Sequence, residues 1–281
     1  MSLSRQHVVL RSLRGNPPSE VRIGDNVGYG SVVRTPEQGV RFRCATDDGE
    51  MLAGLHYRGA PGGPGWVVAH GFTHGIDKPA TRQVMAAFAA HGGVVAVDFR
   101  GHGRSTGRSS VGRDETLDLD AAVRSAREFG YSSVAVVGFS LGAAVALRHA
   151  ADGVDRGDAI VAVSAPSRWY VRETTPMRRL HWLLESPAGP AVGRLLGVRL
   201  TPPWEHLPPS PVEAMADITV PCLLVHGAKD QYFGPAHAQT LRRASGGVAD
   251  LWIEHDMGHG ETGTSVALID RIAAWTTAVM A

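Results

Sequence analysis

The sequence predicts an α/β fold built on a mostly parallel sheet with helices on both of its faces. From residue 40 onward, short apolar runs alternate with segments of helical spacing. Some of these runs, such as residues 93–97, are apolar throughout, as strands buried on both faces are. Residues 134–137 form another such run, which leads within a few positions into the helix-forming residues 143–147. This alternation is typical of parallel strands joined by crossover helices.

Composition restricts the kind of protein further. The 281 residues suffice for one large α/β domain or two small ones, and the net charge of +1 offers no electrostatic basis for binding nucleic acid or an anionic membrane. Cys44 and Cys222 fall in expected strands, and two buried thiols are favoured over a disulfide. No apolar run approaches the ~18 residues of a membrane span. Arg11 ends the short apolar run before it, so no signal peptide is expected. We expect a cytoplasmic protein with a small-molecule substrate.

The chain begins with a segment that is hard to interpret. Residues 1–39 are rich in Gly, Pro and Arg, and we expect an N-terminal leader with one strand along the domain edge. The core of the fold is expected at residues 40–166 and 218–281. Residues 40–44 alternate and residues 51–57 return after a polar turn, which predicts an antiparallel hairpin at the edge of the sheet.

The remaining elements follow in order along the chain. Strands are expected at residues 66–69, 93–97, 134–137, 159–164, 220–225 and 248–253. Helices are expected at residues 78–91, 114–129, 235–244 and 261–280, and directly after Ser140. The helix at 114–129 has an acidic first turn and a basic later half, which matches the helix dipole.

One segment breaks the alternation of strands and helices. Residues 167–217 contain many prolines and short helical runs at 177–184 and 191–196, and this length far exceeds ordinary connections. Disordered segments are poor in aromatic residues, whereas this one contains Trp169, Trp182 and Trp204. We therefore predict a small helical cap over residues 167–217. We expect these tryptophans to bind an apolar acyl or alcohol portion of the substrate.

The candidate nucleophile lies in the stretch Gly138-Phe139-Ser140-Leu141-Gly142, between an apolar strand and a helix. So tight a bend strains the corner residue, and the two glycines remove the Cβ atoms that would clash there. The Ser140 hydroxyl is thereby placed at a helix N-terminus, where the dipole and free N–H groups favour developing negative charge.

A serine nucleophile needs a base, and near neutral pH that base is most often histidine. Among 13 histidines we favour His259, in a loop between the last strand and the closing helix, over His255, which looks like the end of that strand. The base in turn needs a carboxylate that fixes its tautomer. Asp230 follows a strand end on the same rim and fits the chain order Ser, Asp, His. Asp256 and Asp250 are its rivals.

The tetrahedral intermediate needs donors aimed at its oxyanion. We expect these to be the backbone N–H of Leu141, at the helix start, and that of Phe72, in the loop after residues 66–69. His70 and His74 flank Phe72, but no cluster of carboxylates or cysteines joins them, so no metal site is expected.

A glycine-punctuated turn at residues 98–105 admits two interpretations. In the functional interpretation, Asp98 or His102 serves as an alternative catalytic group. In the structural interpretation, which we favour, the segment is a tight polar loop braced by its own side chains.

These motifs together resemble the α/β-hydrolase fold enzymes over residues 40–281. The resemblance rests on His70-Gly71-Phe72, the turn at 98–105, the elbow at 138–142, His226-Gly227-x-x-Asp230 and Gly258-His259-Gly260. Within the superfamily the sequence is most similar to the esterase, monoacylglycerol-lipase-like and serine-aminopeptidase-like branch. The resemblance implies an eight-stranded sheet, a cap inserted after the sixth strand and no cofactor. The serine at the elbow argues against a dehalogenase or an epoxide hydrolase, because the family pattern gives those enzymes an aspartate at that position.

The function expected is a serine hydrolase that cleaves a carboxylic ester through a Ser140-His259-Asp230 triad and an acyl-enzyme. Thioester, amide or carbon–carbon hydrolysis and acyl transfer by the same triad remain open, as does a catalytically idle receptor. An aminopeptidase would need a buried carboxylate in the cap, for which Glu173, Glu185, Glu205 and Glu213 are candidates. The cap also contains Arg168, Arg172, Arg178 and Arg179. We expect most of them on a solvated face, and any one of them is a candidate partner for a substrate carboxylate.

Overall fold

An eight-stranded sheet forms the centre of the residues that the structure, a computed structural model, describes, namely 39–202 and 204–281. Its strands are β1 (Val40–Ala45), β2 (Met51–Tyr57), β3 (Pro64–Ala69), β4 (Gly93–Val97), β5 (Ser133–Phe139), β6 (Ala159–Val163), β7 (Cys222–Gly227) and β8 (Asp250–Glu254). β2 runs antiparallel to β1 and β4, and all other neighbouring pairs are parallel. The predicted fold class, with its antiparallel edge hairpin, is confirmed. The expected N-terminal leader with its edge strand lies outside the described residues, apart from Gly39.

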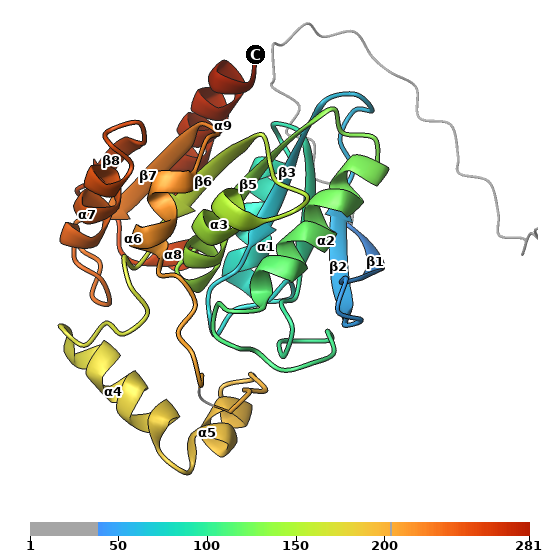
Figure 1. The fold of residues 1–281 in the computed structure, drawn as a ribbon. Helices are drawn as coiled ribbons and strands as arrows, with labels where there is room; N and C mark the ends of the chain where they lie inside the picture. Colours follow the sequence, from blue (N-terminus) through green and yellow to red (C-terminus); the bar gives the residue numbers. More distant parts are fainter. Residues whose placement is uncertain (1–38, 203) are drawn as a thin grey trace, which may run out of the picture. The chain divides into compact units, whose positions relative to one another are not determined.

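The strand order creates a topological switch point in the middle of the sheet, between β3 and β5. The order is β1-β2-β4-β3-β5-β6-β7-β8, so the chain leaves β3 toward β4 and then returns to β5 on the other side of β3 (Figure 1). Connections that depart in opposite directions leave a crevice beyond the carboxyl ends of β3 and β5. The segments that follow these two strands are His70 onward and Ser140 onward.

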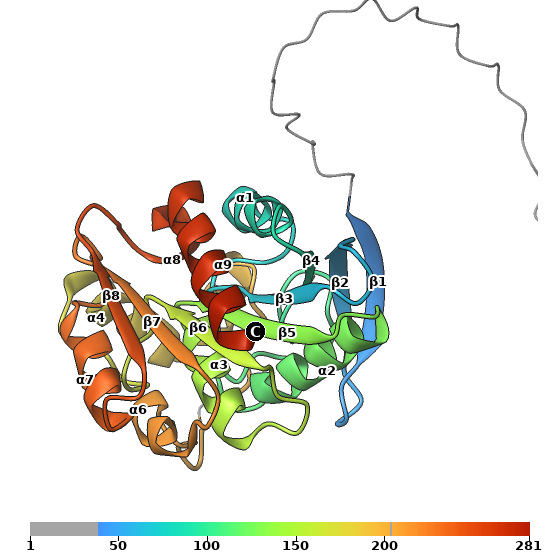
Figure 2. The ribbon, with the colours of Figure 1, turned by 90° about the horizontal axis from the view of Figure 1, so that it is seen from above.

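Helices cover both faces of the sheet. They are α1 (Pro79–Phe88), α2 (Glu115–Glu128), α3 (Leu141–Asp152), α4 (Thr175–Glu185), α5 (Gly189–Leu195), α6 (Pro211–Ala214), the 3₁₀ turn η1 (Met215–Asp217), α7 (Ala236–Ala244), α8 (Gly260–Gly263) and α9 (Val266–Met280). Viewed from above, α1 and α9 lie on one face, and α2, α3, α6 and α7 lie on the other (Figure 2). In the described part of the chain, no helix combines the length and the apolar character that a bilayer crossing demands.

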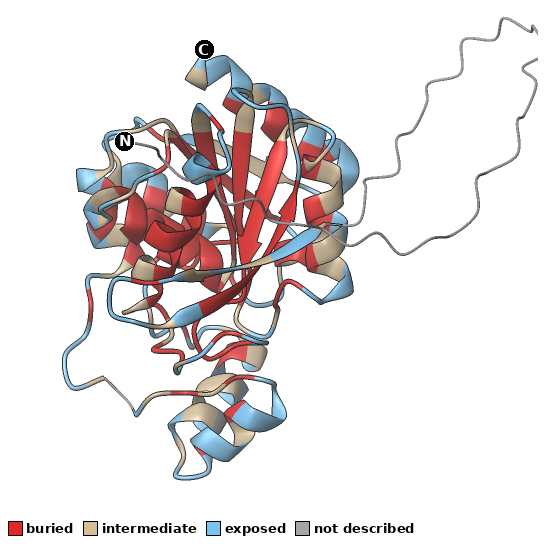
Figure 3. Cartoon of the chain, turned by 90° about the vertical axis from the view of Figure 1, so that its right-hand side faces the viewer, coloured by how far each residue is buried: buried red, intermediate tan, exposed pale blue. Residues whose placement is uncertain are grey.

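Each face of the sheet has its own apolar core. On the α1 and α9 face, Phe88 and Ile272 pack against strand residues such as Val68. On the opposite face, Leu119 and Leu147 pack against residues such as Val67. The inner strands β2 to β7 are buried almost throughout (Figure 3), which explains why most of their sequences are apolar runs, whereas the edge strands β1 and β8 are half-buried or exposed.

The cap predicted after the sixth strand is present and is helical. α4 and α5 lie beyond the carboxyl ends of the strands (Figure 1), and Val171 and Met177 pack with Phe233 of the loop after β7. α6 and η1, which close the predicted segment, pack against α3 and α7 of the core. The exact domain boundaries at residues 167 and 217 stay a prediction.

Two sequence expectations differ in detail from the structure. The single closing helix expected at residues 261–280 is split into α8 and α9, because the hydroxyl of Ser265 accepts the N–H of Leu268 and starts a new helix. Both cysteines are free thiols; Cys222 is buried, which raises its pKa to about 12, whereas Cys44 is only half-buried. They lie on β1 and β7, six strand positions apart, which corresponds to roughly 29 Å across a sheet.

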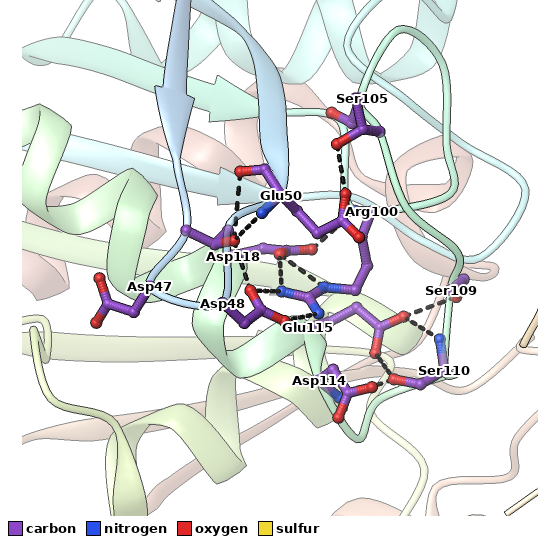
Figure 4. Close-up of polar contacts among 12 residues, drawn as sticks. Asp47, Asp48, Glu50, Arg100, Ser105, Ser109, Ser110, Asp114, Glu115 and Asp118 are labelled. Atoms are coloured by element: carbon purple, nitrogen blue, oxygen red, sulfur yellow. Dashed lines mark hydrogen bonds and ion pairs between the residues drawn. The ribbon is translucent and has the colours of Figure 1, made fainter.

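The turn after β4 is braced by ion pairs of the buried Arg100 side chain (Figure 4). The guanidinium of Arg100 bonds the carboxylate of Asp118 in α2 and that of Asp48 in the hairpin turn. The carboxylate of Asp98 accepts the N–H groups of Ile76 and Arg104. The side chains of Asp98 and Arg100 thus bond groups of the turn itself and of neighbouring elements. These bonds support the interpretation of residues 98–105 as a turn braced by its own side chains.

Candidate active site

The backbone at Ser140 is strained in the way that the elbow motif predicts. Ser140 joins β5 to α3 at φ 53° and ψ −113°, a conformation that L-residues rarely adopt. A Cβ on Gly138 would lie 2.3 Å from the carbonyl oxygen of Gly142, and one on Gly142 would lie 2.2 Å from that of Ala69. Neither position tolerates a side chain, so the two glycines permit the bend that lifts the Ser140 hydroxyl above the sheet.

Ser140, His259 and Asp230 form one hydrogen-bonded chain. The Nε2 atom of His259 lies 2.9 Å from Oγ of Ser140, and its Nδ1 lies 2.7 Å from Oδ2 of Asp230. An aspartate cannot donate when ionised, so Nδ1 carries the proton and Nε2 faces the hydroxyl as an acceptor. This tautomer can take the serine proton as the hydroxyl attacks a carbonyl carbon.

Asp230 is held as an ionised acceptor. Its side chain is fully buried, and its Oδ1 accepts the N–H groups of Tyr232 and Phe233 at 2.8 and 3.0 Å. Burial alone would raise the pKa of Asp230, but the hydrogen bond from His259 and these backbone donors outweigh burial and lower it. The rings of Tyr232 and Phe233 also lie beside the imidazole of His259, with centroids 4.6 and 5.3 Å away.

Two backbone N–H groups near Ser140 have no acceptor within the described protein. One belongs to Leu141, the first residue of α3, whose N–H no turn of the helix can satisfy. The other belongs to Phe72, in the loop after β3. Gly71 precedes Phe72 and faces Ser140, since a Cβ on Gly71 would lie 3.5 Å from the serine Cβ. These are the two N–H groups that the sequence suggested as oxyanion donors, and that role stays a prediction.

His70, also in this loop, is structural rather than free for ligand binding. Its Nε2 accepts the N–H of Phe99 at 3.0 Å, so its Nδ1 carries the proton and donates to the carbonyl of Gly71 at 2.8 Å. Burial, together with the nearby His102, holds the pKa of His70 well below its ordinary range. Across the described residues, no cluster of three or more potential metal ligands occurs.

The other sequence candidates for the base and the acid lie elsewhere. His255 is exposed at the end of β8, and Asp256 is 93% exposed and pairs with Lys229. Asp250 lies at the start of β8 and accepts the indole N–H of Trp275. His102 faces the loop after β3 instead, and its Nε2 donates to the carbonyl of Phe72 at 2.6 Å.

Three further residues support this arrangement, and of these the sequence analysis named only His226, as the first residue of the motif that ends at Asp230. Ser164, at φ 56° after β6, accepts the N–H of Gly260 next to the base. Buried His226, whose pKa burial lowers, donates to the carbonyl of Phe233 in the acid turn. Glu261 accepts the N–H of Gly71. Of the two residues that the sequence analysis missed, only Glu261 carried a readable signal, as a carboxylate two positions after His259.

The structure brings together two of the three cap tryptophans. The rings of Trp169 and Trp204 meet edge to face at 5.6 Å, and Tyr170 lies 6.0 Å from Trp204. Trp204 donates to the carbonyl of Ser110. Trp182 stands apart on α4 with 73% of its surface exposed.

The charged residues of the cap largely pair with one another at the surface. The four glutamates considered as amine partners, Glu173, Glu185, Glu205 and Glu213, are all exposed. Glu173 pairs with Arg168 and Glu185 with Arg172, while Arg178 donates to backbone carbonyls. None of the four is the buried carboxylate that an aminopeptidase would require.

Two hollows lie along the cap. One, of about 740 Å³, is lined by charged residues and Tyr170. The other, of about 710 Å³, lies between the cap and α3 and is lined by Trp169, Tyr170, Leu207 and neighbouring prolines, with arginines and carboxylates at its rim. Ser140 and His259 line neither hollow, but both are partly exposed and so are open to a substrate.

The sequence matches a family model. Residues 66–268 match the model described as the alpha/beta hydrolase family, which is well over half of the chain. The chain belongs to the alpha/beta hydrolase family. It is a hydrolase, as the family assignment implies. A search of curated protein sequences finds no match.

Solved structures share the fold. The esterase Pf2001 of Pyrococcus furiosus superposes with a TM-score of 0.71 at 23% identity, covering 91% of this chain and 96% of that one. The esterase RhEst1 from Rhodococcus sp. has a TM-score of 0.62 at 19% identity over 85% and 99%. Est1E from Butyrivibrio proteoclasticus, solved with ferulic acid bound, has a TM-score of 0.59 at 16% identity over 84% and 98%. At these identities the likeness describes the fold.

Proposed function

We propose that this hydrolase is a serine esterase that cleaves carboxylic esters with an apolar acyl or alcohol portion. The observation that carries the proposal is the hydrogen-bonded chain from Ser140 through His259 to Asp230. Fold relatives named as esterases support it, as does the resemblance to the esterase and monoacylglycerol-lipase-like branch.

The reaction has two halves. In the first, Oγ of Ser140 attacks the ester carbonyl carbon while Nε2 of His259 takes the hydroxyl proton. The N–H groups of Leu141 and Phe72 stabilise the resulting oxyanion. Collapse of the intermediate breaks the ester C–O bond, and His259 returns the proton to the leaving alcohol. In the second half, water attacks the acyl-enzyme, and the same histidine receives and then returns a proton to Ser140.

The substrate preference follows from the cap. Trp169 and Trp204 offer ring faces to an apolar chain. The cap glutamates are exposed and mostly paired, so they favour an ester over a substrate with a free amine. A role for Trp182 stays a prediction.

A p-nitrophenyl ester series from acetate to palmitate tests the proposal, with Ser140→Ala beside the wild type. We expect hydrolysis with a maximum at one chain length, and loss of that hydrolysis in the variant. A fluorophosphonate probe should label Ser140 in the wild type. A folded wild-type protein that neither hydrolyses any ester nor reacts with the probe would refute a serine esterase.

A further inference from the structure

A buried carboxylate lies beside the proposed site and has no part in the reaction described above. Glu261 is in α8, two positions after His259, and only 2% of its side chain is exposed. Its Oε1 accepts the backbone N–H of Gly71 at 2.8 Å, across 190 positions of sequence. The Nδ1 atom of His74 lies 3.7 Å from the same oxygen.

The partner of Glu261 belongs to the loop that presents the oxyanion donor. A Cβ built on Gly71 would lie 3.3 Å from Oε2 of Glu261 and 3.5 Å from Cβ of Ser140. Gly71 thus lies between the nucleophile and the buried carboxylate. Without a side chain, Gly71 has unusual backbone freedom, so contacts from outside must hold the two peptide planes that flank it.

Both of these peptide planes are held by hydrogen bonds. The peptide plane before Gly71 contains the N–H of Gly71, which donates to the carboxylate of Glu261. The plane after it contains the carbonyl of Gly71 and the N–H of Phe72, which point in opposite directions in a trans peptide. That carbonyl accepts from Nδ1 of His70 at 2.8 Å and from the N–H of His74 at 3.0 Å. Fixing the carbonyl on one side directs the Phe72 N–H to the other.

The segment that contains His259 and the short helix α8, with Glu261, is itself held by hydrogen bonds. The N–H of Gly260 donates to Oγ of Ser164 at 3.1 Å, and the N–H of Gly263 donates to the carbonyl of His259 at 3.1 Å. A bond from this segment to Gly71 therefore joins the loop of the base to the loop of the oxyanion donor.

We infer that Glu261 is a positioning residue for the oxyanion hole, which orients the Phe72 N–H relative to His259 through its bond to Gly71. The inference rests on the proposed esterase function. Glu261 touches no reacting atom in this arrangement and acts through the backbone of Gly71. The effect of losing it should appear in the transition state, where the oxyanion forms, rather than in substrate binding.

Two substitutions at Glu261 test the inference. Glu261→Ala removes the acceptor, whereas Glu261→Gln keeps an oxygen that can accept the Gly71 N–H. Asp120 supplies the matched control, since it is also buried and accepts the N–H groups of Val154 and Asp155, beyond the end of α3 remote from Ser140. If Glu261→Ala does not fold, Glu261→Met replaces it, because methionine keeps the volume and lacks the oxygen.

Kinetics on the best p-nitrophenyl ester give the first measurement. We expect Glu261→Ala to lower kcat about 30-fold or more with KM within about threefold, the pattern of a lost transition-state interaction. Glu261→Gln should stay within about fivefold of the wild-type kcat, because it keeps the hydrogen bond. Asp120→Ala and Asp120→Asn should keep kcat within about twofold, even if they lower the unfolding midpoint.

Inhibition gives the second measurement. A trifluoromethyl ketone forms a hemiketal oxyanion with the serine, so its Ki should rise in Glu261→Ala by about the factor lost in kcat/KM. A loss confined to KM, an equal loss of kcat in Asp120→Ala, or no recovery in Glu261→Gln would overturn the inference.

The rate of fluorophosphonate labelling separates this inference from the proposed function. An unlabelled wild-type protein counts against the esterase itself. A wild type that is labelled at Ser140, with Glu261→Ala labelled equally fast, counts against the role of Glu261 alone.

Discussion

The Nδ1 atom of His259 lies 2.7 Å from Oδ2 of Asp230, although 29 positions separate the two residues. They belong to loops that follow β8 and β7, which are adjacent parallel strands. Parallel neighbours end at the same edge, so the sheet brings the two loops together. The bond fixes which imidazole nitrogen faces Ser140.

Replacing Asp230 by asparagine should disable catalysis while leaving the fold intact. An amide at this position favours the wrong imidazole tautomer, and we expect kcat to fall about 10³- to 10⁴-fold. Asp256→Asn is the control, because Asp256 is 93% exposed and pairs only with Lys229 among the described residues. Steady-state kinetics of both variants decide the point; comparable losses in the two would contradict the assignment of Asp230.

The buried histidine beneath the start of the cap should make the protein acid-sensitive. Nδ1 of His237 accepts the N–H of Ser167 at 3.1 Å, and burial, with the charge of Arg168, lowers its pKa from 6.5 to about 4. The unfolded chain binds this proton near pH 6.5 and the folded chain only near pH 4. Stability is therefore full above pH 6.5 and is lost as the pH falls toward 4.

His237→Asn isolates that contribution, because the asparagine oxygen can replace Nδ1 as acceptor but cannot be protonated. Between pH 7 and pH 4.5, the wild type should lose about 2 kcal/mol more of its unfolding free energy than the variant does. Urea denaturation at the two pH values measures this difference. Parallel losses in the two proteins would show that His237 does not titrate on unfolding.

A methyl group at the second elbow glycine should destabilise the whole fold. In Gly142→Ala the new Cβ would lie 2.2 Å from the carbonyl oxygen of Ala69, which belongs to buried backbone that cannot move aside easily. We expect a loss of about 3 kcal/mol or more in the free energy of unfolding. Gly234→Ala is the control, since a Cβ there would meet no atom within 4 Å, and it should change stability by about 0.5 kcal/mol or less. Similar urea midpoints for the two variants would disprove the clash.

Truncation of the packed Trp169 and of the exposed Trp182 should have different effects on stability and on substrate binding. Trp169 packs against Trp204 and so closely on Gly112 that a Cβ on this glycine would lie 2.4 Å from the indole ring. Trp169→Ala should cost about 2 kcal/mol of stability and raise KM for long-chain esters more than for acetate. Trp182→Ala should cost well under about 1 kcal/mol, because the side chain is 73% exposed. Thermal unfolding and KM across the ester series provide the comparison, and equal costs would argue against it.

Local sequence pattern was sufficient for the strands, most helices and the elbow. Continuous apolar runs such as residues 93–97 are required wherever a strand is buried on both faces, so the pattern and the burial are the same fact. The bend at Ser140 was equally readable, because the clashes that require glycine at 138 and 142 are local to the motif. The break between α8 and α9 was missed, since the cap formed by Ser265 competes with a continuous helical pattern.

The α/β sheet, the helical cap and a strained serine between strand and helix could all be predicted from the pattern of residues alone. These features depend on contacts among residues close together in the chain or on the average burial of a segment. Loop position and chain order already favoured His259 and Asp230, but only the tertiary structure gives the hydrogen bonds that join Ser140 to His259, across 119 positions, and His259 to Asp230, across 29. It also decided that Glu261 reaches Gly71 across 190 positions. Such pairs are set by the order and direction of the strands, which no local pattern of residues encodes.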